Sequence, residues 1–327
     1  MSSWNDEIET ALKELMIETD SWKQITEEIN KKFNINISVA SAKSYAYRRG
    51  LTLPKKEKEY ESRKETIDKK YGVVSDDDIA LYVINTTKEW VPIWTVGDMH
   101  AGSEAFDEDS FMIDRDWAIK NNMYLMGVGD WMEASVPTHM PKTMFGQNAT
   151  PYNQAKYLIE TMLPFKGRTI TIVDGNHEKR VRNLTSFRPL EEVSTELDAL
   201  HMNNGGLVTI RVNDIDYNIY ITHGASFAKG NKEVEDFGAI WKNVDVVIEG
   251  HTHRCESWKM NQGWINVNQK KVLVEQIGIR SGHYLLQKGY VEEKPYKPLL
   301  SESMVIWLNS KTKEIQVSRA RSSFSLV

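Results

Sequence analysis

The sequence predicts a protein of mixed α/β class with a small helical domain in front of it. Residues 4–51 carry apolar side chains at helical spacing, whereas the chain beyond residue 78 contains repeated short apolar runs typical of buried strands. Between these regions, residues 55–77 are rich in Lys, Glu, Asp and Arg, a composition typical of an exposed linker. We therefore expect a domain at residues 1–54, a charged linker at 55–77 and a second domain at 78–327.

Composition limits the classes of protein and of metal site. The 327 residues are 40% hydrophobic with a formal charge of −5, so contact with nucleic acid would need a local basic patch. The sequence has no apolar run of about 18 residues and no signal-peptide pattern, so we expect a cytoplasmic protein without a membrane partner. Its one cysteine, Cys255, excludes a thiolate-rich zinc cluster. Metal ligands must come from His, Asp, Glu and Asn.

Three short helices are predicted in the first domain. Apolar positions recur through Ile8 and Leu12, then through Trp22 to Phe33, and a third segment ends near Gly50. Three helices with a turn before the last resemble a helix-turn-helix module, whose last helix would lie in the major groove of DNA. Basic residues gather late in the segment, and the candidate DNA contacts are Lys43, Tyr47, Arg48 and Arg49. A protein-docking module with a solvated basic face is the alternative.

In the second domain, apolar runs repeatedly end beside glycine and a metal-competent residue. The runs are residues 91–96, 124–128, 169–173, 219–222 and 244–248. Open α/β sheets build their sites at the carboxyl ends of strands, and five such ends make chance an implausible explanation. The oxygen and imidazole donors that follow them suit Mn, Fe, Zn or Ni. The sequence therefore predicts a metal site at these strand ends.

Asp98 and His100 follow the first of these runs. Taken alone, the pair is weak evidence, because a Gly-Asp pair after a strand is more often a turn. In an extended chain, residues two apart point to the same face, so the carboxylate and the imidazole are expected to converge. The later strand ends would supply the remaining ligands.

The motifs resemble those of the calcineurin-like metallophosphoesterase superfamily. They read Gly97-Asp98-Met99-His100, Gly129-Asp130-Trp131-Met132-Glu133, Gly175-Asn176-His177-Glu178, His223 and Gly250-His251-Thr252-His253. The resemblance covers residues 91–255 by motif and, by domain, the chain from about residue 79 onward. It implies a fold of two mixed β-sheets packed face to face and flanked by helices, an αββα sandwich. The helical domain lies outside it.

The resemblance also implies roles for individual residues. Asp98, His100 and His253 would hold one metal ion, Asn176, His223 and His251 the second, and Asp130 would bridge them. His177 would be the catalytic histidine, whereas Glu133 stands where many members carry another residue. Two divalent ions, preferably Mn²⁺ with Fe, Zn or Ni as alternatives, would lower the pKa of a shared water, providing hydroxide for in-line attack on phosphorus. Protonated His177 would assist the leaving group.

Other residues near the motifs are candidates for supporting roles. Arg180 could hold a substrate phosphate, because a guanidinium binds such oxygens in bidentate fashion. His283 and, in the loop after the second motif, His139 are further candidates for substrate contact. We expect Glu178 to orient a neighbour by hydrogen bonding. His201, after a helix predicted at residues 190–200, is expected to be structural.

The function predicted from these observations is a metal-dependent DNA phosphodiesterase, either an endo- or an exonuclease. The superfamily motifs do not separate its nucleases from its phosphatases, but a helix-turn-helix module would raise the effective concentration of DNA at the site. The alternative enzyme is a phosphomonoesterase for a small molecule or a phosphoprotein, with a docking domain in front. A DNA-binding regulator with an inactive scaffold is a third reading, disfavoured because every motif residue is present.

Overall fold

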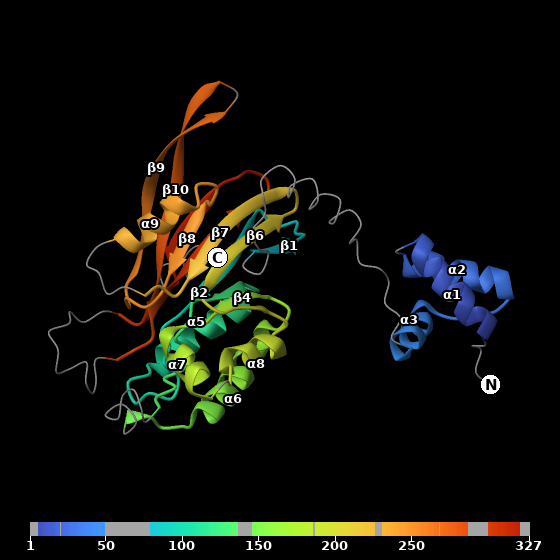
Figure 1. Cartoon of the computed structure of the whole chain (residues 1–327), viewed down its shortest axis with the longest axis horizontal. Coiled ribbons are helices and arrows are strands. Elements are labelled where there is room, and N and C mark those ends of the chain that lie inside the picture. Colours follow the sequence, from blue (N-terminus) through green and yellow to red (C-terminus); the bar gives the residue numbers. More distant parts are fainter. Residues whose placement is uncertain are drawn as a thin grey trace. The chain divides into compact units, whose positions relative to one another are not determined.

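The chain divides into two compact units after Asp76 (Figure 1). The computed structural model describes residues 6–19, 21–49, 79–136, 146–185, 187–225, 231–267, 269–286 and 300–320. The predicted linker at 55–77 and the histidine at position 139 lie outside the described residues.

The first unit consists of α1 (Asp6–Glu18), α2 (Trp22–Phe33) and α3 (Val39–Arg48), as the apolar spacing predicts. Helix α2 has clear ends: the Ser21 hydroxyl accepts a hydrogen bond from the Gln24 N–H, and Asn34 is left-handed with φ 47°. A shared core, in which Leu12, Ile25 and Ile29 are fully buried, holds the helices together.

A clamp fixes the turn between α2 and α3. The Asn30 amide nitrogen donates to the Ile37 carbonyl at 2.9 Å, and the Ile37 N–H donates to the Asn30 amide oxygen at 2.8 Å. Both polar groups of the turn residue are thus satisfied by one side chain. The angle between α2 and α3 is therefore set by side-chain hydrogen bonds as well as by the core.

In the described part of the second unit, twelve strands form one hydrogen-bonded network. Their order is β1-β6-β7-β8-β10-β11-β2-β3-β4-β5, with β12 beside β11 and β9 beside β10. The strands are β1 (Ile79–Ile84), β2 (Trp90–Val96), β3 (Tyr124–Gly127), β4 (Thr169–Val173), β5 (Leu200–Met202), β6 (Gly205–Val212), β7 (Ile215–Thr222), β8 (Val246–Glu249), β9 (Cys255–Val267), β10 (Lys270–His283), β11 (Glu302–Asn309) and β12 (Ile315–Arg319).

The large mixed sheet is flanked by helices, as expected, but its halves are not separate sheets. Strand β10 joins them: residues 277–280 pair with β8, and residues 282–283 pair with β11. One buried cluster contains side chains of both halves, including Ile93 of β2 and Ile219 of β7. The sequence could not show this connection, because it depends on how one long strand is shared.

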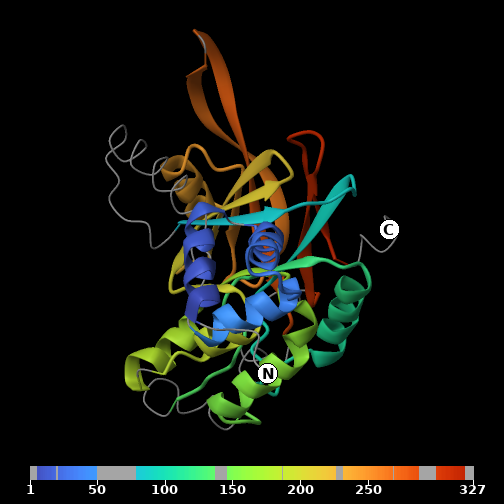
Figure 2. The ribbon, with the colours of Figure 1, turned by 90° about the vertical axis from the view of Figure 1, so that its right-hand side faces the viewer.

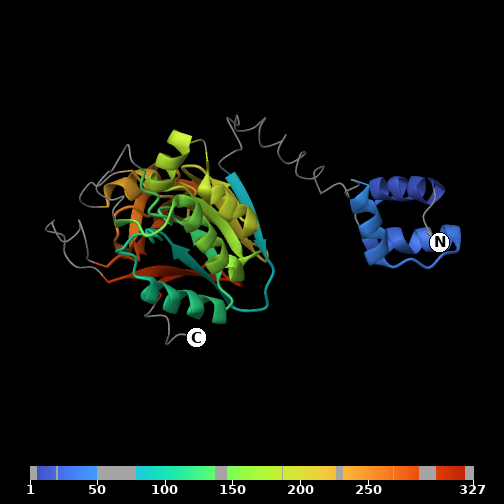
Figure 3. The same cartoon turned by 90° about the horizontal axis from the view of Figure 1, so that it is seen from below.

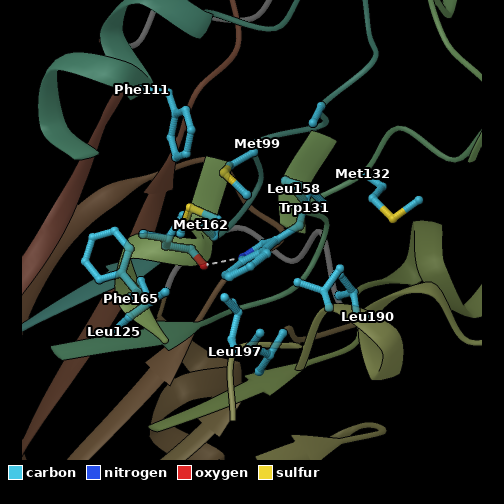
Figure 4. Packing of buried hydrophobic residues seen from close by; sticks show 14 of the residues in the cluster. Met99, Phe111, Leu125, Trp131, Met132, Leu158, Met162, Phe165, Leu190 and Leu197 are labelled. Carbon is cyan, nitrogen blue, oxygen red and sulfur yellow. Dashed lines mark hydrogen bonds between the residues drawn. The ribbon is translucent and has the colours of Figure 1, made fainter. Parts of the chain in front are cut away.

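Helices cover both outer surfaces of this sheet (Figures 1 and 3). Figure 4 shows the core under α5, α6 and α8, in which Trp131 packs among Met99, Met162 and Leu197. A smaller apolar cluster, with Val234 at its centre, lies under α9. The helices are α5 (Glu108–Lys120), α6 (Pro151–Met162), α7 (Asn176–Thr185), α8 (Pro189–Glu196) and α9 (Lys232–Ile240).

One predicted helix ends earlier than expected. Helix α8 stops at Glu196, and after the left-handed Asp198 (φ 55°) the chain enters β5, which pairs with β4. His201 therefore lies in a strand. Among the described helices, none combines the length and the apolar character that crossing a membrane requires.

Candidate metal centre

The predicted ligands gather at the carboxyl ends of five strands. Strands β2, β3 and β4 run parallel side by side, as do β7 and β8, so the loops that follow them meet at one edge. The backbone joins these loops directly: the Asp98 N–H donates to the Gly129 carbonyl, and the His100 N–H donates to the Asp130 carbonyl, both at 3.0 Å. The loops thus form one hydrogen-bonded unit.

The ligand loops are not extended, contrary to the expectation for Asp98 and His100. Five predicted ligands have left-handed backbones: Asp98 (φ 49°), His100 (51°), Asp130 (49°), His251 (65°) and His253 (56°). This conformation is unfavourable for residues with a Cβ, and it persists only where the surrounding structure imposes it. The side chains still converge, but a strained turn brings them together rather than strand alternation.

The first group contains Asp98, His100 and His253. One candidate ligand atom from each lies within 4.8 Å of the others. Nε2 of His253 is 3.3 Å from Oδ1 of Asp98, and the other carboxylate oxygen accepts a hydrogen bond from the His251 N–H at 2.9 Å. Nε2 of His100 is buried without a hydrogen-bond partner. Such an orphaned acceptor beside a carboxylate fits a cation site.

The second group contains Asp130, His223 and His251, again within 4.8 Å, and Asn176 adjoins it. The Asn176 amide oxygen lies 3.2 Å from Oδ2 of Asp130, 2.9 Å from Nδ1 of His251 and 3.2 Å from Nε2 of His223. Hydrogen bonding alone would favour an amide turned by 180°, because carboxylate and amide oxygens both only accept. A cation at the centre of these atoms reverses that preference, so the residues fit a metal ion.

Asp130 belongs to the second group but also lies close to His100 of the first group. Its Oδ2 is 3.2 Å from Nε2 of His223 and 3.8 Å from Nε2 of His100. Its Oδ1 accepts the His177 N–H at 2.9 Å, which fixes the carboxylate. The buried clusters are consistent with a dinuclear metal site in which this carboxylate is shared.

Electrostatics in the metal-free chain reflect the crowding of carboxylates and imidazoles. Burial opposes protonation of His100, but the Glu133 hydrogen bond and the Asp130 charge raise its pKa to about 9. Burial likewise opposes protonation of His223, yet Asp130 raises its pKa to about 10. Protons therefore occupy these imidazoles until a metal displaces them.

His177 is the second residue of α7 and is 9% exposed. Its Nδ1 lies 2.5 Å from the Glu133 carbonyl oxygen, which can only accept, so Nδ1 carries a proton. Nε2 faces the centre, 3.9 Å from Oδ2 of Asp130. Burial lowers the pKa of His177, so the neutral ring presents an unprotonated Nε2 toward the two groups. The geometry suits proton exchange at that atom.

Glu133, whose role the motif comparison left open, contacts one predicted ligand and supports His177. Its Oε2 is 3.1 Å from Nδ1 of His100, and its Oε1 accepts the Ser135 hydroxyl at 2.8 Å. A carboxylate on the far nitrogen of a ligand histidine fixes the ring and its tautomer. Candidate ligand atoms of His100, Glu133 and His177 also lie within 4.8 Å of one another. We interpret Glu133 as the residue that orients His100.

Glu178 ties together the loops after β3 and β4. It accepts three backbone N–H groups, from Asp130 at 3.1 Å, Met132 at 3.0 Å and Gly175 at 2.9 Å. Burial raises the pKa of this carboxyl to about 8. Glu178 was expected to orient a neighbour, and the structure shows that it does so by binding backbone N–H groups beside the predicted ligands. Gly175 is required there, because a Cβ would lie 2.0 Å from Oδ1 of Asp130.

Two candidate substrate contacts flank the centre. Nη2 of Arg180 lies 2.9 Å from the amide nitrogen of Asn176, so the guanidinium is beside the second group. The His283 ring lies 5.5 Å from that of His253 and is 5% exposed. Its Nδ1 accepts the Leu285 N–H, so a neutral ring carries its proton on Nε2, which has no hydrogen-bond partner. Burial lowers the pKa of His283 to about 4.

His201, expected to be structural, has a buried partner. Its Nε2 lies 2.7 Å from Asp174, which also accepts from Arg182 at 2.9 Å. Asp174 immediately precedes Gly175, so this pair supports the start of α7.

The candidate DNA contacts of the first unit differ in their surroundings. Lys43 is exposed on α3, whereas the side chains of Tyr47 and Arg48 lie outside those described. Arg49 is 3.7 Å from Glu9 and 5.6 Å from the Tyr45 ring, so part of its charge is engaged within the unit.

Sequence reasoning missed Tyr284, which anchors the first ligand loop. Its N–H donates to the Asp98 carbonyl at 3.1 Å, and its hydroxyl donates to Asp114 at 2.9 Å. Asp114 is fully buried in α5, a helix that was not predicted. Phe111, Asp114 and Ala118 share the buried face at helical spacing, and an acidic residue on such a face was the available signal.

Comparisons with known proteins identify a family. A model described as calcineurin-like phosphoesterase matches residues 91–255. A search of curated proteins finds no match. Among solved structures, vacuolar protein sorting 29 of Cryptosporidium parvum has a TM-score of 0.37 and 11% identity, covering 71% of this chain and 97% of its own.

Two further structures are similar at the same level. A protein of Streptococcus pneumoniae described as a predicted phosphoesterase has a TM-score of 0.33 and 12% identity, covering 72% of this chain and 92% of its own. Vps29 of Entamoeba histolytica in complex with Zn²⁺ has a TM-score of 0.27 and 15% identity, covering 59% and 95%.

Proposed function

Because this chain belongs to the calcineurin-like phosphoesterase family, we propose that it is a dinuclear-metal-dependent phosphodiesterase whose substrate is DNA. The observation that carries the metal-dependent part is the position of the Asn176 amide oxygen among Asp130, His223 and His251. These carboxylate, amide and imidazole atoms would hold a cation, whereas in its absence an amide turned by 180° would donate to them. The DNA part depends on the first unit, whose turn is rigid and whose Lys43 is exposed.

The residues divide between two metal positions. Asp98, His100 and His253 would hold one ion; Asn176, His223 and His251 would hold the other, and Asp130 would contact both. Ions at these positions would activate water and neutralise phosphoryl oxygens. The donors are oxygens and imidazole nitrogens, and Mn²⁺ is our preferred metal, with Fe, Zn or Ni also compatible.

Four residues beside the metal positions would orient a ligand, exchange a proton or contact the substrate. Glu133 holds His100 in one orientation, and His177 exchanges a proton through Nε2 because its Nδ1 is committed to a carbonyl. Arg180 would donate to a phosphoryl oxygen beside the second group. His283 would donate a hydrogen bond from Nε2 beside the first group.

A metal-by-substrate panel on the full chain tests this proposal. We expect hydrolysis of bis-p-nitrophenyl phosphate, linear duplex DNA and single-stranded oligonucleotides, greatest with Mn²⁺ and absent with EDTA. Circular DNA separates endonuclease from exonuclease activity. Strong hydrolysis of p-nitrophenyl phosphate with inert DNA would replace the proposal by the phosphomonoesterase alternative. No hydrolysis of any ester with any metal would leave the scaffold reading.

A further inference from the structure

The hairpin of β9 and β10 continues well beyond the sheet to which it belongs. Only residues 277–280 of β10 pair with β8, whereas the pairing with β9 continues to Lys270 and Val267. Figures 1 and 2 show the hairpin standing away from the rest of the second unit. We call residues 259–275 the ribbon. A projecting two-stranded ribbon is marginally stable alone and contributes little core, so its exposed side chains need another explanation.

The ribbon is basic in an acidic protein. Residues 259–275 contain three lysines and one acidic residue, Glu275, although the whole chain carries a formal charge of −5. Lys259, Lys270 and Lys271 are all exposed. This local charge is complementary to a phosphodiester backbone.

The ribbon also presents an exposed tryptophan. Trp264 is 59% exposed, and it is the only exposed tryptophan in the described part of the chain. Its position opposite Leu273 places it on the same face as Lys271, whose Nζ lies 4.6 Å from the indole ring centroid. An aromatic face flanked by cations is the arrangement that proteins use to stack unpaired bases while contacting phosphates.

The root of the ribbon adjoins the metal centre. Strand β9 begins at Cys255, two residues after His253, and β10 ends at His283. Trp264 is nine positions after Cys255, so an extended strand places the indole at most about 30 Å from the root. A nucleic acid long enough to span this distance could contact the ribbon while one of its phosphodiesters occupies the centre.

We propose that the Trp264 face of the ribbon binds a single-stranded stretch of the nucleic-acid substrate, with Lys271 contacting its phosphates. This inference rests on the proposed function, because it assigns the ribbon to substrates that the metal centre would cleave. The ribbon should therefore affect the binding of long substrates, which reach it, and should not affect small diesters, which do not.

The test compares Trp264→Ala and Lys271→Gln in the full Mn²⁺-loaded chain. The long substrate is an oligonucleotide of about 30 nucleotides, beyond the about 16 that one single-strand site occupies. We expect KM for this strand to rise roughly tenfold in Trp264→Ala, from lost base stacking, with kcat unchanged. Lys271→Gln should lower the slope of log affinity against log salt by about 0.7, the value for one phosphate contact on a single strand. Hydrolysis of bis-p-nitrophenyl phosphate should not change.

Two control variants isolate stacking and charge. Trp264→Phe keeps an aromatic face and should retain most affinity for the strand. Lys311→Gln/Lys313→Gln removes two exposed lysines from the turn between β11 and β12 and should leave the oligonucleotide affinity unchanged. Thermal melting of all variants shows whether the fold is preserved.

Three outcomes separate the proposals. If the wild-type chain cleaves DNA and the ribbon variants equal the controls, the ribbon proposal alone is overturned. If the chain binds the labelled strand through Trp264 by fluorescence anisotropy but cleaves no DNA, the ribbon proposal stands and the nuclease proposal fails. A change in oligomeric state by analytical ultracentrifugation, without a change in strand affinity, would assign the ribbon to contact between copies and overturn our inference.

Discussion

The metal centre and the ribbon meet within a few residues of the chain, yet they are built in opposite ways. The centre is buried, with Asp98 and His223 inaccessible to solvent, and its backbone is held in left-handed conformations by neighbouring loops. The ribbon is exposed, its outer strands pair only with each other, and a Cβ added at Gly263 would meet no atom within 4 Å. Neighbouring loops therefore fix the positions of the side chains in the metal centre, whereas the side chains of the ribbon can adjust.

This difference follows from the chemistry that each region is proposed to perform. Positioning ions and a proton carrier requires side chains locked by packing and hydrogen bonds. Contacting polymers of varied sequence requires charge and aromatic surface, which tolerate adjustment. Substitutions in the centre should therefore have large effects on every substrate. Substitutions on exposed basic surfaces should have small effects that appear only with nucleic acid.

Asp130→Asn should have the largest effect. It removes the charge that lies 3.2 Å from Nε2 of His223 and 3.8 Å from Nε2 of His100, one histidine of each ligand group. We expect hydrolysis of all esters to fall by more than the factor of about 10⁴ that bounds the loss of one proton-transfer group. Mass spectrometric metal analysis should find fewer than two ions per chain. Asp216→Asn, at an exposed ion pair with Arg211, should retain both ions and activity, and equal losses in the two variants would contradict the assignment.

His177→Asn should reduce kcat by about 10²–10⁴ while leaving both ions in place. The side chain contacts the Glu133 carbonyl through Nδ1 and faces Asp130 at 3.9 Å, so it is not needed to complete either ligand group. Single-turnover kinetics and metal analysis on the same preparation check this. Loss of metal in proportion to activity would show instead that His177 is a ligand.

Most of the fold was predictable because its signals are local. The apolar spacing located all three helices of the first unit and the five strands whose ends carry the motifs. The sharing of β10 between both halves was not predictable, because strand pairing partners are set by distant contacts. Helix α5 was missed because Asp114 interrupts its apolar face, and the partner of this buried carboxylate, the Tyr284 hydroxyl, lies far away in the sequence.

The convergence of the motif residues was predicted for a partly mistaken reason. Strand alternation was expected to align Asp98 with His100, but the structure aligns them through left-handed residues held by the Gly129 and Asp130 carbonyls. Backbone strain of this kind depends on neighbouring loops and leaves no periodic trace in sequence. The ribbon shows the opposite case. Its lysines can be read directly from the sequence, but only the structure shows that they are exposed.

Metal binding should release protons and strengthen with pH. The pKa values of about 9 for His100 and about 10 for His223 are raised, so both rings are protonated below pH 9 and must lose a proton to coordinate. Affinity should rise up to about tenfold per pH unit for each proton displaced. Titration calorimetry in buffers of different ionisation enthalpy measures the number released.

Glu133→Gln is the matched variant for this pH effect. Removing the charge beside Nδ1 should lower the pKa of His100, so fewer protons are released at pH 8. Metal affinity at high pH should still fall by about 10–100-fold, because the ring loses its orienting carboxylate. Proton release that is absent in the wild type, or unchanged in Glu133→Gln, would contradict the electrostatic account of the centre.

Lys43→Gln should have the smallest effect and decides whether the first unit contacts DNA. Neutralising one phosphate contact should reduce the salt slope of duplex binding by about 0.9, with no change in bis-p-nitrophenyl phosphate hydrolysis. Lys13→Gln is the control in the same unit, because Lys13 pairs with Glu9 at 2.8 Å. If both variants bind duplex DNA like the wild type, the basic face of α3 would be better explained by a protein partner. The metal centre would keep its assigned chemistry in that case, because its ligand groups all belong to the second unit.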